Sequence, residues 1–228
     1  MGLPLGESGP KLLFDFGRIT IQLVSGILIV ILFSYQLSNE LQQRIVYGYL
    51  VRGVSRSEYI FGKLLGSWLA VLLLVASADC LLAILVNAEV MEIRVGGSLQ
   101  SSLGVSVWLQ LFVAQAIHLW VLAALTLFVG SLSESFLFVC LISLLVWVTG
   151  SALLGSVTYA GGTEGFSLMV LKTIGTLVPQ FQLTGLGDEM WYAGTLDRGS
   201  IVSYCIRATL HSICFFAVSH WVFRKREL

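Results

Sequence analysis

Apolar residues gather in five long runs along this chain, separated by shorter polar stretches. The hydrocarbon core of a bilayer is about 30 Å thick, and a helix of about 20 apolar residues crosses it. Each run is close to that length or longer, so the pattern predicts five membrane-spanning helices. Their approximate bounds are residues 19–37, 64–86, 105–129, 136–157 and 201–223.

A sixth apolar region, residues 166–186, differs from these runs because it contains Lys172, Gly175, Pro179 and Gly185. Proline lacks a backbone donor and clashes with the preceding turn, so a straight helix through Pro179 is disfavoured. We expect two short helices that enter the outer face of the membrane and return. Irregular backbone is tolerated at membrane depth only where it packs against protein.

Composition supports a membrane protein. Hydrophobic residues make up 57% of the 228 residues and charged residues only 11%, whereas soluble domains carry about 25% charged residues. Mean hydropathy is +0.89. The chain is therefore predicted to be a single all-α domain, residues 1–228, folded as a polytopic transmembrane bundle. The 13 basic and 13 acidic residues balance, which gives no reason to expect a nucleic-acid partner.

Basic residues indicate the orientation, because Lys and Arg are enriched in cytoplasmic loops. Residues 38–63 and the tail 224–228 are dense in them, so we place both segments in the cytoplasm. Five spans then place the amino terminus outside. The basic residues of the two segments are Arg44, Arg52, Arg56, Lys63, Arg224, Lys225 and Arg226.

The polar insert at residues 39–63 has the pattern of two short helices. Leu41, Ile45 and Tyr49 recur every four residues, which indicates an amphipathic helix, and Gly53 ends it. A second helix is predicted to start near Ser55, which forms a capping-box pair with Glu58. This shape favours an elbow that docks on a protein partner. A helix lying on the lipid surface is the alternative.

The same stretch resembles a known signature. The sequence ELQQRIVYGYLVRGVSRSEYIFGKLLG, residues 40–66, is similar to type-2 ABC exporter permeases, the group that includes permeases of gliding-motility and copper-enzyme-maturation systems. LVPQFQLTGL resembles the outer re-entrant region of that family, and FRKREL resembles its basic tail. Ile45 stands where the family usually has Thr, and Gly53 where it usually has Pro. From this resemblance we expect that the family's first span has no counterpart among the five apolar runs.

The resemblance implies that the elbow is a coupling helix docked on a separate ATPase subunit, which binds ATP and Mg. It implies two permease subunits, as two copies or homologues, with two ATPase subunits in the plasma (inner) membrane, and allows an outer accessory protein. Glu134, in the tight turn between the third and fourth runs, is a candidate second contact to the cytoplasmic partner. The elbow residues assigned to coupling are Glu40, Arg44, Tyr49, Leu50, Arg56 and Glu58.

Catalytic signatures are missing from the sequence. It has no G-x-x-x-x-G-K-[ST] loop for ATP, no H-E-x-x-H and no G-x-S-x-G, the patterns typical of nucleotide binding, zinc proteolysis and serine hydrolysis. We expect a non-catalytic chain without a cofactor or metal of its own. The four cysteines lie in apolar runs without CxxC spacing and are interpreted as free thiols.

Charged residues inside spans are costly and are usually paired or functional. Asp79 and Arg207 lie at matching depths in the second and last spans, which predicts a buried ion pair, for packing or along a substrate path. His211 shares a face with Arg207. Gln115 and His118 share a face of the third span, directed to a cavity or to a neighbouring helix.

These observations favour the membrane subunit of an ATP-driven ABC exporter. A force transmitter or scaffold in the same assembly, with nothing transported, is the main alternative. An intramembrane enzyme is a weaker alternative, because the sequence lacks the motifs of the common hydrolases. A small-molecule channel is the remaining alternative.

Overall fold

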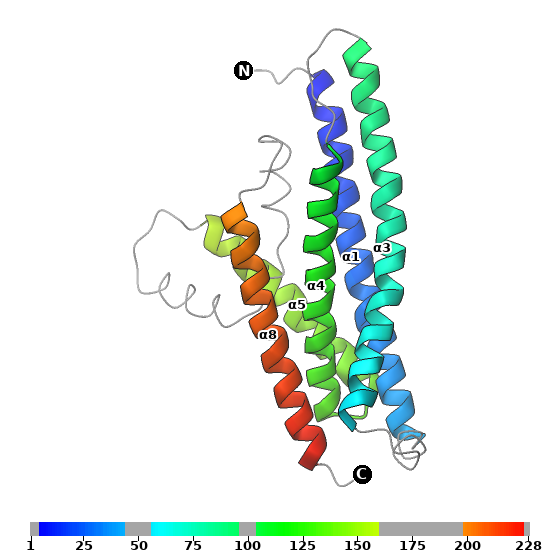
Figure 1. Cartoon of the computed structure of the whole chain (residues 1–228), viewed down its shortest axis with the longest axis vertical. Helices are drawn as coiled ribbons and strands as arrows, with labels where there is room; N and C mark the ends of the chain where they lie inside the picture. The colour runs from blue at the N-terminus through cyan, green and yellow to red at the C-terminus, as the bar shows by residue number, and fades with distance from the viewer. Residues whose placement is uncertain (1–4, 44–55, 96–103, 160–197, 226–228) are drawn as a thin grey trace.

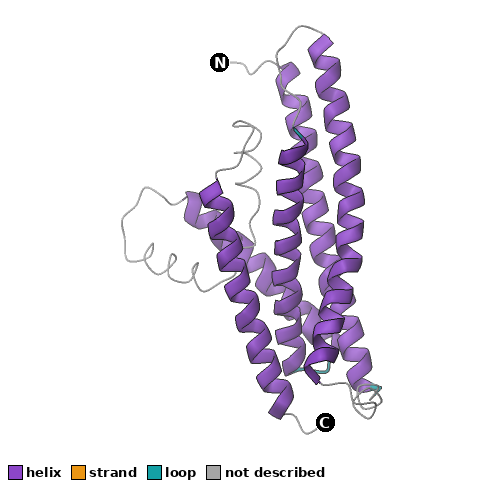
Figure 2. Ribbon diagram, viewed as in Figure 1, coloured by secondary structure: helices purple, strands orange, loops and turns teal. Residues whose placement is uncertain are grey.

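The computed structural model describes residues 5–43, 56–95, 104–159 and 198–225, and within them every regular element is a helix (Figures 1 and 2). The predicted all-α class is confirmed. The predicted elbow tip and the re-entrant region, residues 166–186, lie outside the described residues and stay predictions. The helices are α1 (Leu5–Gln42), α3 (Arg56–Val95), α4 (Val105–Leu132), α5 (Phe136–Tyr159) and α8 (Arg198–Lys225).

Four of these helices, α1, α3, α4 and α8, are long and apolar enough to cross a membrane. The fifth, α5, carries a shorter apolar stretch, Phe136–Ala152, in its described part. Each predicted run lies inside one helix, and α1 and α3 continue well beyond their runs. The helices therefore support a multi-pass membrane protein.

Helix α4 forms the centre of the described bundle. It packs against α1, α3, α5 and α8, and α1 also packs along α3. Leu119, Leu122 and Leu127 of α4 are fully buried. Trp68 of α3 donates its indole N–H to the carbonyl oxygen of Ala116 at 2.9 Å, which ties α3 to α4. An apolar core therefore surrounds the polar groups inside the bundle.

The segments predicted to share one side of the membrane have their described ends close together. The end of α1, the start of α3, the turn between α4 and α5 and the end of α8 all lie at one end of the molecule (Figure 1). In that turn, the Ser135 amide donates to Ser133 Oγ at 3.2 Å, and the Val139 amide donates to the Ser135 carbonyl at 3.0 Å. Residues 38–43 and the carboxyl-terminal end of α8 therefore lie on the same side.

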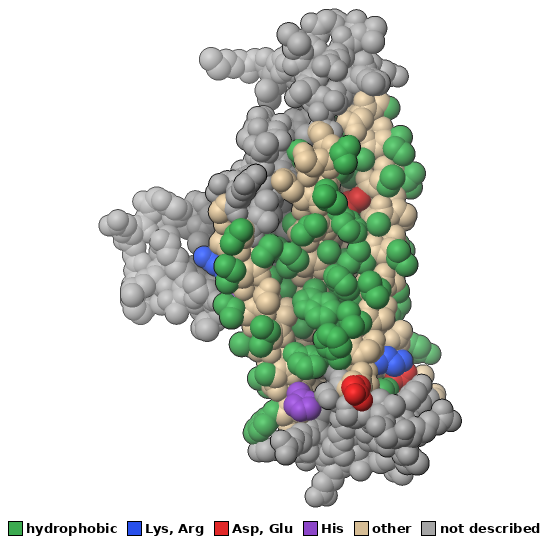
Figure 3. Space-filling view, viewed as in Figure 1, with side chains coloured by type: hydrophobic (Ala, Val, Ile, Leu, Met, Phe, Trp, Pro, Cys, Tyr) green, Lys and Arg blue, Asp and Glu red, His purple; other side chains and the backbone are tan. Residues whose placement is uncertain are grey.

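Apolar side chains are spread over the whole described surface seen in Figure 3, and several of the few charged side chains seen there lie near its lower end. Leu12, Phe16 and Leu73 are 73%, 72% and 74% exposed. Contiguous apolar surface of this extent is disfavoured in water and is expected for helices that face lipid.

Candidate functional site

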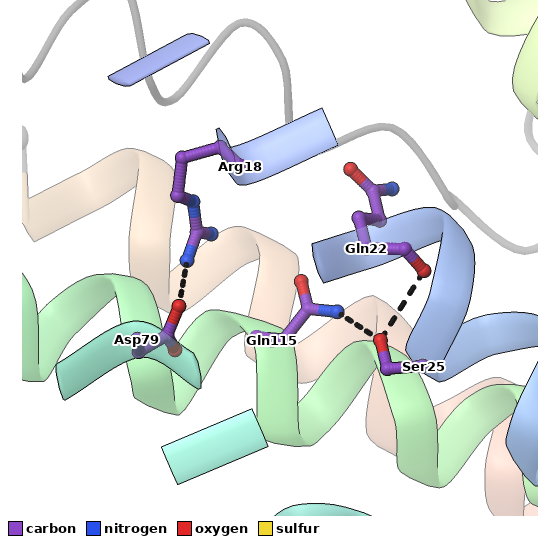
Figure 4. A network of polar contacts seen from close by, with 5 residues as sticks. All are labelled: Arg18, Gln22, Ser25, Asp79 and Gln115. Carbon is purple, nitrogen blue, oxygen red and sulfur yellow. Dashed lines mark hydrogen bonds and ion pairs between the residues drawn. The ribbon is translucent and has the colours of Figure 1, made fainter. Parts of the chain in front are cut away.

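A polar cluster lies inside the apolar bundle where α1, α3 and α4 meet (Figure 4). Arg18 of α1 donates from Nη1 to Oδ1 of Asp79 of α3 at 3.2 Å. Their side chains are only 11% and 9% exposed. Two charges taken out of water are tolerated only as a pair, so this contact holds α1 and α3 in register.

Gln115 of α4 extends the cluster. Its amide nitrogen donates to Ser25 Oγ of α1 at 3.0 Å, and the Ser25 hydroxyl donates to the Gln22 carbonyl oxygen at 3.2 Å. Gln115 and Ser25 are both fully buried. One turn along α4, His118 is also fully buried and packs its ring against that of Trp147, with 6.1 Å between the centroids.

The predicted Asp79–Arg207 pair is wrong, because Asp79 binds Arg18. Arg207 is exposed on α8, and α8 packs mainly against α4, whereas Asp79 lies at the α1–α3 contact. Matching depth was an insufficient criterion, since it says nothing about which helices are neighbours. His211 shares the face of Arg207 as expected, and its Nδ1 lies 2.7 Å from the Arg207 carbonyl oxygen.

A second polar contact, the clasp, ties the same two helices together at the predicted cytoplasmic end. Glu40 of α1 accepts hydrogen bonds from the Tyr59 hydroxyl and the Lys63 ammonium group of α3. One turn further into the bundle, Ser67 Oγ donates to Gln36 Oε1 at 3.1 Å. A groove of about 530 Å³ adjoins the clasp and is lined by Tyr59, Lys63 and Ser67, among other residues. The clasp therefore fixes the two helices on either side of residues 44–55.

The residues assigned to coupling are described only in part. Arg44, Tyr49 and Leu50 lie outside the described residues, so their assignment to coupling stays a prediction. Helix α3 begins at Arg56, and Glu58 is exposed in its first turn. Glu134 is exposed between α4 and α5. The side chains of Glu58 and Glu134 are therefore accessible to a docking partner.

Sequence reasoning missed Arg18 and Lys63 as partners. Arg18 stands immediately before the first apolar run, residues 19–37, and no role was assigned to it. Arg18, Gln22 and Ser25 follow the i, i+4, i+7 spacing of one helix face. That stripe was the available signal for a polar face directed into the bundle.

The described residues contain no group of three or more His, Cys, Asp or Glu side chains that could hold a metal ion. All four cysteines are free. The Arg18–Asp79 pair and the clasp stabilise the packing of α1 on α3 at two levels of the bundle.

Comparison with protein-family models, with curated proteins and with solved structures found no match for this chain.

Proposed function

We propose that this chain is the membrane-spanning permease subunit of an ATP-driven exporter. It works with a second permease and with separate ATPase subunits that bind ATP and Mg. The proposal rests on the sequence signature at residues 40–66 and on one structural observation, the clasp of Glu40 with Tyr59 and Lys63 at the base of that segment.

The clasp supports the proposal for a mechanical reason. Residues 44–55 join the end of α1 to the start of α3. Because Glu40 holds the two helices together beside this junction, a push on the junction displaces α1 and α3 as a unit. Hydrogen bonds to charged groups contribute about 1.5–3 kcal/mol each. The two hydrogen bonds of Glu40 therefore favour the packed arrangement of α1 and α3 when the junction between them is pushed.

The buried cluster supports the same mechanism at a second level, inside the bundle. Arg18 and Asp79 lock α1 to α3, while Gln115 ties α1 to α4. Helix α4 contacts every other described helix. Movement of the α1–α3 pair therefore reaches the rest of the bundle through polar contacts that are costly to break. Work done by ATP hydrolysis on a partner would thus reach the outer part of the membrane.

A force transmitter without a transported substrate is the second candidate. It is favoured by the filled centre of the described bundle, where Leu119, Leu122 and Leu127 of α4 have no exposed surface. A substrate path would then have to lie between two copies. A flux assay with reconstituted complex separates the two functions, because only an exporter moves a substrate.

The direct test changes the coupling segment. Tyr49→Ala and Leu50→Ala remove apolar contact area, and Arg56→Glu reverses a charge at the start of α3. Each variant should insert and fold normally, yet lose association with the ATPase or its substrate-stimulated hydrolysis. Leu73→Ala, on a face of α3 that is 74% exposed at that residue, is the matched control. Wild-type association and hydrolysis in all three variants would favour the lipid-surface helix instead.

A further inference from the structure

The groove beside the clasp, called the clasp groove from here on, lies where α1 and α3 reach one surface of the membrane. The apolar span of α1 ends at Glu40, and that of α3 begins at Phe61. The volume of the groove, about 530 Å³, is in the usual range of small-molecule sites, about 300–1,000 Å³. A ligand of this groove must therefore suit the boundary between water and hydrocarbon. The polar side chains of its lining include Gln36, Glu58, Tyr59, Lys63 and Ser67.

Two glycines leave the surface of α3 hollow here. Gly62 and Gly66 lie one turn apart in the lining, and a Cβ atom added at either would meet nothing within 4 Å. Further along α3, Leu69 and Leu73 continue the same face at helical spacing and are 51% and 74% exposed. The hollow therefore leads onto apolar surface that faces lipid.

The charges along α3 follow a fixed order with depth. The span of α3 begins at Phe61, and a helix rises about 1.5 Å per residue. Glu58 thus lies about 4.5 Å outside the span, while Lys63 lies about 3 Å and Ser67 about 9 Å inside it. From the water inward, the groove presents an acid, a base, an uncharged polar group and then the apolar face of α3.

Lys63 and Gln36 keep hydrogen-bond donors for a ligand. An ammonium group has three N–H donors, and the described residues take one of them, through Glu40. The Lys63 side chain is 30% exposed. Gln36 accepts from Ser67 with Oε1 at 3.1 Å, which leaves its amide N–H groups for another acceptor. Both groups suit the phosphate and ester oxygens of a lipid.

Glu58 gives the clasp groove its excess charge. Among the described side chains at this place, Glu40 and Glu58 are acidic and Lys63 is basic, and Lys63 is paired with Glu40. Glu58 is exposed in the first turn of α3. The excess negative charge favours a ligand whose outermost group is a cation.

The chemistry of the lining favours a primary ammonium group. A primary ammonium donates charge-assisted hydrogen bonds to a carboxylate such as Glu58. A quaternary ammonium has no N–H and is typically bound by a cage of aromatic rings. Within the described lining, Tyr59 is the one aromatic residue, and its hydroxyl is bound to Glu40. The groove therefore suits ethanolamine better than choline.

We propose that the clasp groove binds phosphatidylethanolamine from the adjoining leaflet. Its ammonium group contacts Glu58, its phosphate contacts Lys63, and an ester carbonyl accepts from Gln36. The acyl chains then run along Leu69 and Leu73. The order of groups from the end of the headgroup to the chains is the order of charge and polarity along α3. The proposal stands whether or not the chain is a permease.

The test is native mass spectrometry of the full chain, titrated with phosphatidylethanolamine, phosphatidylcholine and phosphatidylglycerol that share the same acyl chains. We expect phosphatidylethanolamine to bind about tenfold more tightly than phosphatidylcholine, the effect of one hydrogen bond to a charged group. Phosphatidylglycerol should bind most weakly. Glu58→Gln keeps the shape of the side chain and should reduce the affinity for phosphatidylethanolamine to that for phosphatidylcholine.

A second variant tests the place of binding. Gly62→Leu fills the hollow, where a Cβ atom meets nothing, and should lower the affinity for phosphatidylethanolamine by about tenfold. Ser77→Leu is the matched control, because Ser77 is exposed deeper on the same helix. It should leave the affinities for all three lipids unchanged.

Four results would overturn the proposal. Equal affinities for the three lipids would mean that no headgroup is recognised, and tightest binding of phosphatidylglycerol would mean that basic residues attract an anionic headgroup instead. A preference for phosphatidylethanolamine that survives Glu58→Gln would exclude the carboxylate as the recognising group. Unchanged lipid affinity in Gly62→Leu, with loss of a dimer, would identify a second copy of the chain as the occupant of the groove.

Discussion

Arg18 of α1 and Asp79 of α3 form an ion pair with 3.2 Å between Nη1 and Oδ1, and each side chain is about nine-tenths buried. The pair lies where two long, largely apolar helices pack along each other. Removing one partner leaves an uncompensated charge where solvation is poor, whereas removing both leaves only a smaller packing defect.

The first prediction concerns this pair. Asp79→Asn and Arg18→Gln should each lower the free energy of unfolding by about 3–5 kcal/mol. The double variant should lose much less than the sum, because neither charge is left alone. Thermal or denaturant unfolding in a mild detergent measures all three. Arg207→Gln is the control, because Arg207 is exposed. Simple additivity of the two losses would contradict the pairing.

The second prediction concerns the clasp. Glu40→Gln keeps the shape of the side chain but removes the charge that binds Lys63, and Lys63→Met removes the other partner. Each substitution should lower the free energy of unfolding by about 1.5–3 kcal/mol. Each should also speed amide hydrogen exchange at the start of α3. Gln43→Ala, which breaks only an exposed contact with Asn39 on the same segment, should change neither quantity measurably.

The third prediction compares two glycines. A Cβ at Gly26 would lie 2.4 Å from the Trp147 ring, while a Cβ at Gly62 would meet nothing within 4 Å. Gly26→Ala should therefore destabilise the protein by about 1–3 kcal/mol through overpacking. Gly62→Ala should be neutral or should stabilise by up to about 1 kcal/mol, because alanine favours helix. The melting temperatures of both variants, measured in the same detergent, test this difference. Equal shifts in melting temperature would mean that α5 does not pack on α1 at Gly26.

The fourth prediction concerns topology. In a variant without native cysteines, Glu134→Cys should react with an impermeant thiol reagent only after the cytoplasmic side is opened. Gly104→Cys, at the opposite end of α4, should react in intact cells. The density of basic residues at the end that carries Glu134 is the reason. Labelling of Glu134→Cys from outside would invert the orientation.

The sequence predicted the class of fold well because the runs report directly on the bilayer. Each run lies inside one helix, but α1 begins at Leu5 and α3 extends to Val95. The apolar span of α1 in the structure, Gly9–Glu40, is longer than the run at residues 19–37, because single polar residues such as Lys11 and Asp15 interrupt an apolar run without ending the helix. Helix ends were therefore less predictable than helix number.

The polar site was less predictable, because pairing depends on which helices are neighbours. Asp79, Gln115 and His118 were recognised as buried polar candidates, since a polar residue within an apolar run is visible in the sequence. The partner of Asp79 was not, because periodicity fixes the face of each helix but not the helix that it meets. Arg207 was chosen by its depth along the last span, and only the packing of α1 on α3 identifies Arg18 as the partner.

The central claim is that a separate ATPase drives this membrane chain. The most direct measurement is affinity purification of the tagged, full-length chain from its native membranes, followed by assay of Mg-dependent ATP hydrolysis. We expect an ATPase subunit in equal amount to the permease, with hydrolysis that falls when Arg56→Glu is introduced. A chain that purifies without any ATPase, even after cross-linking in the intact membrane, would contradict the account.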